Sequence, residues 1–133
     1  MTEVHMAHAR LTQAVLRNAD ISLAMIADAE LSGSDLSHAN LKQTNLVRAN
    51  LSRCDLTAAV LDGAGFIKAR IRDAKLNEVS AKQADFYEAD LSGSDLTNGD
   101  FRGSRLQLAD LDHAVTDGMR TQGALLVDGT VGQ

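Results

Sequence analysis

The sequence predicts a solenoid, in which the backbone turns a corner at every fifth residue and stacks one polygonal coil upon the next. Three observations lead to this fold class. A large apolar residue recurs at every fifth position from Leu11 to Leu111, and 20 of these 21 positions hold Leu, Ile or Phe. Two positions before each of them, Ala occupies 14 of the 21 sites and small side chains fill most of the others. The position in between is Asp or Asn in 11 of 21 cases.

A period of five fits neither a helix nor a flat strand. Five residues advance an α-helix by about 500°, so successive leucines are offset by about 140° and form no face. In a flat strand an odd period sends alternate leucines to opposite sides. A chain that bends once in every pentapeptide directs every large residue inward, and the small residue two positions earlier leaves room for the bend. We therefore expect a polygonal coil with an apolar interior.

The individual repeats resemble the Ala-Asp/Asn-Leu-X-X motif of the pentapeptide-repeat family. Examples are Ala-Asn-Leu-Lys-Gln at 39–43, Ala-Asn-Leu-Ser-Arg at 49–53 and Ala-Asp-Leu-Ser-Gly at 89–93. The similarity extends from 9 to 113 without a break in phase. It implies an all-β fold, a right-handed quadrilateral β-helix with four repeats per coil and about five coils. The expected domain organisation is an N-terminal lead-in at 1–8, the repeat region at 9–113, and a degenerate repeat, cap or dimerisation tail at 114–133.

A circumference of four repeats predicts which side chains stack in the interior. Phe66 and Phe86 are separated by four repeats and should lie in one inward column. At Val79-Ser80-Ala81 the large and small positions are exchanged, a swap that roughly conserves volume. Phe101 follows Ala81 by one coil, and its ring is expected to fill the missing volume.

Composition narrows the classes of function. The 133 residues carry 13 Lys and Arg against 18 Asp and Glu, a formal net charge of −5. A nucleic-acid-binding protein needs concentrated positive charge, so we expect no nucleic acid as a partner. No apolar run approaches the roughly 18 residues of a membrane span, and the N-terminus lacks the apolar stretch of a secretory signal. We expect a bacterial, cytoplasmic protein that does not associate with membranes.

Residues for catalysis are scarce. The single Cys54 takes a small inward position, where a thiol is a packing residue and no nucleophile. His38 and His113 map to different sides of the rod and cannot share a metal ion. No glycine-rich phosphate loop occurs. The sequence therefore predicts no enzyme, no catalytic residue, no cofactor and no metal site.

One side of the predicted rod carries an apolar ladder. The residue after each inward large residue points outward and is usually polar, but on this side it is apolar in four successive coils, with two more apolar residues nearby. These candidate protein-contact residues are Met25, Ala27, Val47, Ile67, Tyr87 and Leu108. Aligned exposed apolar residues indicate a contact surface, although β-branched residues also simply suit a strand.

A second side collects the acidic residues Asp35, Asp55 and Asp95, with Lys75 between them. Two like charges about 5 Å apart in water cost on the order of 1 kcal/mol, which points to a function, while the preference of Asp for turns is the alternative explanation. The repeat region as a whole has 15 acidic and 12 basic side chains, a net charge of −3. Quinolone-resistance members of the resembled family imitate duplex DNA, which carries one negative charge per about 1.7 Å, far more than this rod offers.

The expected function is a non-catalytic protein-interaction or scaffold module. The alternative is a DNA-mimicking inhibitor or protector of a topoisomerase such as gyrase, of the quinolone-resistance type. A protein partner is expected but not identified. In some members of the resembled family a C-terminal extension joins two rods end to end, so the resemblance implies a possible homodimer through the C-terminal end, with the apolar side as the other candidate interface. A solenoid without caps also exposes an apolar layer at each end, which favours such a contact.

Overall fold

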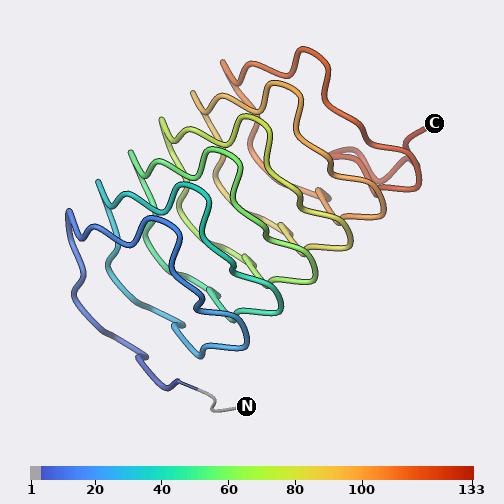
Figure 1. The fold of residues 1–133 in the computed structure, drawn as a ribbon. Coiled ribbons are helices and arrows are strands. Elements are labelled where there is room, and N and C mark those ends of the chain that lie inside the picture. The colour runs from blue at the N-terminus through green and yellow to red at the C-terminus, as the bar shows by residue number, and fades with distance from the viewer. Residues whose placement is uncertain (1–3) are drawn as a thin grey trace.

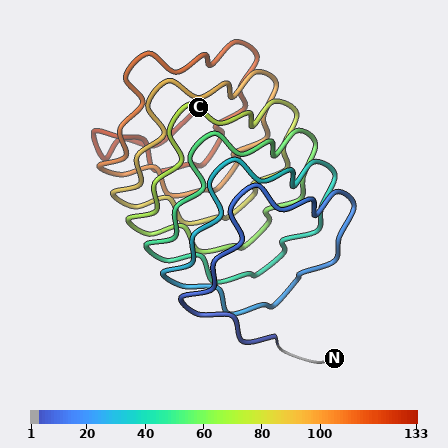
Figure 2. The same ribbon diagram turned by 90° about the vertical axis from the view of Figure 1, so that its left-hand side faces the viewer.

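The computed structural model describes residues 4–133, and the backbone winds through a stack of coils from the N-terminal to the C-terminal end (Figures 1 and 2). Residues 1–3 of the predicted lead-in lie outside the described residues. Residues 4–133 contain no helix, and their β-structure consists of isolated bridges. Each parallel bridge joins residues that are four pentapeptides apart, from His5 with Met25 to Arg105 with Leu125. One coil therefore holds four pentapeptides.

Each corner of the coil is a tight turn at the two residues after the inward large residue. In the turn that follows Leu11, the N–H of Ala14 donates to the carbonyl oxygen of Leu11 at 3.1 Å. The third residue of this turn, Gln13, has a φ of +57°, the left-handed value found in type II turns. A non-glycine residue in this region costs about 1 kcal/mol or more. The neighbouring coil offsets this cost, because the Gln13 N–H donates to Ser32 O at 2.9 Å.

The frequent Asp and Asn occupy the bridge position just before the inward large residue, and their side chains stabilise the following turn. The carboxylate of Asp90 accepts the backbone N–H of Ser92 at 3.0 Å and its hydroxyl at 2.6 Å. Asn50 accepts the N–H of Ser52 in the same way at 3.1 Å. Short side chains that carry an acceptor are suited to this local bond. The Asp or Asn of each repeat thus stabilises the turn that follows it.

The core fills the inside of the coils, where the large residues from Ile26 to Leu106 and the Ala residues beside them are buried. The rings of Phe66 and Phe86 stack with centroids 4.8 Å apart and planes 1° apart, which confirms the predicted column. Phe101 tilts by 50° against Phe86 at 5.5 Å. Its ring edge lies against Gly99, where a Cβ would come within 2.5 Å of it. Gly99 in the same repeat therefore leaves room for this ring, while the filling of the volume at Ala81 by Phe101 stays a prediction.

Polar residues at the small inward position bond to the coil before them. The hydroxyls of Ser34 and Thr44 donate to backbone carbonyls of the preceding coil, at 2.8 Å to Leu11 and 3.0 Å to Ile21. The thiol of Cys54 makes the equivalent contact at 3.0 Å. A buried polar group needs such a partner, so these bonds explain how the repeat tolerates Ser, Thr and Cys in place of Ala.

The two ends of the rod differ. In the first coil the inward residues, such as Leu11 and Leu16, are only partly buried. Past Leu111 the pattern of turns and bridges continues to Leu125, and residues 124–132 then fold back on themselves. Leu125 pairs with Val131 in antiparallel fashion, and Gly132 donates to Ala124 O at 2.7 Å. This return segment covers part of the last coil's backbone edge, which would otherwise be open to strand pairing.

Candidate protein-interaction surfaces

The predicted apolar ladder exists as an alignment but is less exposed than expected. Bridges between successive coils place Val47, Ile67 and Tyr87 one above another, and all three residues are half-buried. The guanidinium of Arg105 lies 4.0 Å from the centre of the Tyr87 ring and covers part of it. Ala27 is half-buried as well. Use of this ladder as a contact surface stays a prediction.

The acidic side is also aligned, with Asp35, Asp55, Lys75 and Asp95 bridged in that order. Each of its carboxylates accepts bonds from the residue two positions later. In Asp35 the hydrogen bonds from Ser37, followed by those from Arg17, lower the pKa to about 2. The Arg17 guanidinium lies 2.6 Å from that carboxylate. The turn role of Asp, which the sequence offered as the alternative, accounts for these side chains without a ligand.

The most exposed apolar side chains lie at the two ends of the rod. Val4, Val15 and Met25 are at the N-terminal end, with Met25 37% exposed. Five more large apolar residues are exposed at the C-terminal end: Leu108, Val115, Leu125, Val127 and Val131. A hollow of about 340 Å³ opens at the same end and includes Val127 of these five residues. It is lined by Leu106, Leu111, Thr116, Met119, Thr121, Leu126 and Val127. We call residues 108–131 with this hollow the C-terminal end surface.

Of these five residues, only Leu108 was named individually as a candidate contact residue, and the other four lie in the segment 114–133 that was expected to be a degenerate repeat, a cap or a dimerisation tail. The signal available in the sequence was the change of residue type at outward positions after Leu111, where Val115, Leu125 and Val127 replace the usual polar residues. Its meaning depended on knowing that the pentapeptide coil continues through this segment.

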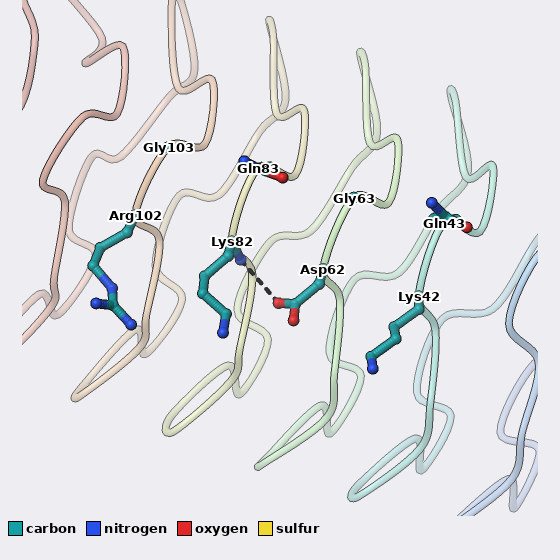
Figure 3. A pocket seen from close by; sticks show the side chains of 8 residues that line it. All are labelled: Lys42, Gln43, Asp62, Gly63, Lys82, Gln83, Arg102 and Gly103. Atoms are coloured by element: carbon teal, nitrogen blue, oxygen red, sulfur yellow. Dashed lines mark hydrogen bonds between the residues drawn. The ribbon is translucent and has the colours of Figure 1, made fainter.

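A groove of about 750 Å³, which was not predicted from the sequence, runs along another corner of the rod. Figure 3 shows its lining, in which Lys42, Asp62, Lys82 and Arg102 come from four successive coils and point the same way. The next position on each coil alternates between Gln and Gly: Gln43, Gly63, Gln83 and Gly103. We call this surface the basic groove. The sequence contained a signal for it, because Lys42, Lys82 and Arg102 are separated by whole coils of 20 residues.

Arg102 of the basic groove is held by a buried carboxylate. Its guanidinium bonds the two oxygens of Asp100 at 2.8 and 2.7 Å, and Arg120 approaches the same carboxylate at 3.2 Å. Only 9% of the Asp100 side chain is exposed. The hydrogen bonds from Arg102, together with the charge of Arg120, lower the pKa of Asp100 to about 2.

This lowered pKa predicts a loss of stability in acid. Because the folded protein binds the Asp100 proton more weakly than the unfolded chain does, the stabilisation is complete above about pH 4 and disappears as the pH falls through about 2. Asp100→Asn should reduce the free energy of unfolding at pH 7 by about 1 to 2 kcal/mol, and the difference from wild type should vanish near pH 2. Urea unfolding at pH 7, 4 and 2 measures this. A difference that persists at pH 2 would contradict it.

The structure offers no metal site among residues 4–133. No group of three or more His, Cys, Asp or Glu residues in this range could hold a metal ion. Burial raises the pKa of the Cys54 thiol to about 12, so the thiol stays protonated and unreactive. Within the same range no helix is long and apolar enough to span a bilayer.

A comparison with models of known protein families identifies the family of this chain. The model of the family "Pentapeptide repeats" matches residues 1–43, 34–73, 64–103 and 84–115. No curated protein matches the chain significantly.

Three solved structures illustrate the similarity. Pentapeptide-repeat protein Rfr23 from the cyanobacterium Cyanothece 51142 is 25% identical, with 82% of this chain and 64% of Rfr23 covered and a TM-score of 0.41. This chain therefore spans less than two thirds of Rfr23. HetL of the cyanobacterium Nostoc sp. strain PCC 7120, a protein involved in heterocyst differentiation regulation, is 25% identical over 98% of this chain and 77% of HetL, with a TM-score of 0.30. The plasmid-mediated fluoroquinolone resistance protein QnrB1 is 18% identical over 83% and 80%, with a TM-score of 0.35. From the family match and the repeats described above, this chain belongs to the pentapeptide-repeat family.

Proposed function

We propose that this protein is a non-catalytic interaction module, a right-handed, four-sided rod of about five coils that associates with a second copy through its C-terminal end surface. The observation that carries the proposal is the concentration of exposed apolar residues there. Leu108 is 58% exposed and Val131 is 59% exposed. A hollow lined mostly by apolar residues, Val127 among them, opens at the same end. Isolated exposed apolar residues need no explanation, but five of them at one end of the rod, together with an apolar hollow, are typical of a contact site.

A second copy is the occupant that fits this end best. The hollow is lined mostly by apolar residues, and no other part of residues 4–133 fills it, so an identical apolar face would complete its burial. A two-fold dimer uses the same patch on both subunits, which suits a single self-complementary end. The apolar ladder is the weaker candidate for self-association, because its side chains are already half-buried in their own rod.

DNA mimicry finds less support in the charge distribution. The acidic side contains Lys75, and Asp35 is neutralised by Arg17 at 2.6 Å. A rod that replaces duplex DNA needs a continuous array of unpaired negative charge.

The test is the oligomeric state of surface variants in sedimentation velocity. Wild type is expected to be a dimer at tens of micromolar, and Leu108→Asp with Val131→Asp is expected to be a monomer with an unchanged thermal midpoint. Val15→Asp is the matched control, because Val15 is exposed at the opposite end of the rod.

Two outcomes would overturn this proposal. One is a wild type that stays monomeric at every concentration. The other is a dimer that survives the end-surface substitutions but is dissociated by Ile67→Asp with Tyr87→Asp, a result that would move the interface to the apolar ladder.

A further inference from the structure

The basic groove stands out against the charge of the chain, which is −5 overall. Lys42, Lys82 and Arg102 face one side of it and Asp62 is the only acidic residue of its lining. We propose that the basic groove binds an extended acidic segment of a partner protein. This inference rests on the proposed role as an interaction module and concerns a different face from the C-terminal end surface.

The two lysines of the groove are available to a ligand. Neither the Lys42 nor the Lys82 ammonium group makes an ion pair with any residue of 4–133, whereas Arg17, Arg48 and Arg102 all do. The carboxylate of Asp62 is engaged locally. It accepts the Ser80 hydroxyl at 2.7 Å and the backbone N–H of Lys82 at 3.0 Å, as Figure 3 shows for the second of these bonds. The groove thus presents free positive charge together with a carboxylate that is already hydrogen-bonded.

The alternation of Gln and Gly shapes the floor of the groove. A Cβ at Gly63 would lie 3.3 Å from Cγ of Gln43, and one at Gly103 would lie 3.3 Å from Cγ of Gln83. Each glutamine stem therefore lies against the glycine of the next coil, in space that a larger residue would take. The terminal amides make no hydrogen bond with the described part of the chain, and a carboxamide both donates to and accepts from a peptide backbone.

The spacing of the Lys-Gln pairs favours one peptide conformation. Lys42-Gln43 and Lys82-Gln83 are two coils apart, or about 9.6 Å at the usual separation of paired strands. A polyproline II segment has a threefold turn and returns to the same face after about 9.3 Å. A β-strand returns after about 6.6 Å, which does not match.

Backbone amides of the groove are already hydrogen-bonded, so a ligand would be recognised by the side chains. The Leu61 and Gly63 amides already bond Ser80 and Lys82 of the next coil, at 2.6 and 3.0 Å. No strand edge runs along this face within 4–133, so a bound strand could not continue a sheet. A polyproline II segment has a fully solvated backbone and needs no strand edge to bind.

Asp62 distinguishes an acidic peptide from a nucleic acid. It lies between Lys42 and Lys82, one coil from each. Carboxylates on a peptide that are about 9 Å apart, one polyproline II turn, can face the two lysines and pass over Asp62. A nucleic acid strand, with a phosphate at each nucleotide, would place negative charge against Asp62 as well.

The experiment measures binding of a fluorescein-labelled peptide of five Glu-Pro-Pro repeats to the full chain by fluorescence anisotropy at low and at physiological salt. We expect saturable binding to wild type that weakens with salt. Lys42→Gln with Lys82→Gln should weaken it about tenfold, as expected for the loss of two exposed ion pairs. Arg53→Gln with Lys75→Gln changes the net charge equally at exposed residues outside the groove and should change the affinity less than about twofold.

The inference would be overturned by no saturable binding to wild type, by an equal loss in both double variants, or by tighter binding of a single-stranded DNA of similar length. A Gln-Pro-Pro peptide that binds as well as the Glu-Pro-Pro peptide would also overturn it. Sedimentation of the same variants separates this inference from the proposed dimer. The Leu108→Asp, Val131→Asp chain should be a monomer that still binds the peptide, and a groove variant should remain a dimer.

Discussion

Replacing Phe86 with alanine is expected to lower the free energy of unfolding by about 3 to 5 kcal/mol, the usual cost of removing a fully buried ring. Phe86 is inaccessible to solvent and is stacked on Phe66 on one side and against Phe101 on the other. In a solenoid each coil packs only on its neighbours, so a cavity here weakens the contacts of three successive coils at once.

Urea unfolding followed by far-ultraviolet circular dichroism measures this loss. Phe86→Leu keeps most of the volume and should cost about 1.5 kcal/mol or less. Tyr87→Ala is the control at the adjacent residue, which points outward and is half-buried, and it should cost clearly less than Phe86→Ala. A loss below about 1 kcal/mol for Phe86→Ala would show that the coils close around the missing ring and would contradict the prediction.

Gly99→Ala should destabilise the fold by about 1 to 3 kcal/mol, although the added group is a single methyl. Its Cβ would lie 2.5 Å from the ring of Phe101 and 3.1 Å from the carbonyl oxygen of Leu96. The backbone of Gly99 is not in the left-handed region, so the effect comes from packing alone. Without the clash, a change from Gly to Ala would stabilise the protein by about 0.4 to 1 kcal/mol through the unfolded state.

Two further variants test this explanation. Gly65→Ala has open space around its Cβ and should be neutral or slightly stabilising. The double variant Gly99→Ala with Phe101→Leu should lose less stability than the sum of the two single variants, because the smaller side chain makes room for the methyl group. Additive losses would mean that Phe101 is not the group that excludes a side chain at position 99.

Most of the interior could be predicted from the sequence. The stacking of Phe66 on Phe86 followed from their separation by four repeats, and the structure confirms it. In a coil of constant circumference, sequence separation alone decides which inward residues meet. The room for Phe101 was harder to predict, because its ring tilts toward Gly99 of its own repeat and against Phe86.

The surfaces were less predictable. Val47, Ile67 and Tyr87 were expected to be exposed, but all three are half-buried and Arg105 covers part of the Tyr87 ring. The positive charge of the basic groove depends on whether its lysines form ion pairs within the chain. Lys68, for example, lies 3.8 Å from Glu88, while Lys42 and Lys82 have no such neighbour among residues 4–133. A long side chain can reach several nearby groups, and its position in the sequence does not determine which of them it pairs with.

The sequence by itself determined the period and the inward and outward positions, because a turn at every fifth residue buries the apolar positions on one side of the backbone. The number of repeats per coil, and with it the alignment of residues in successive coils, was implied by the family resemblance, and the bridges show four repeats per coil. Only the tertiary structure decided how much of each outward side chain stays accessible, which charges are paired, and how residues 124–132 fold back at the end of the rod. These depend on side-chain rotation and on the absence of a further coil, which local residue patterns do not encode. For this reason the fold was predictable from the repeats, while the C-terminal end surface and the basic groove emerged from the three-dimensional arrangement.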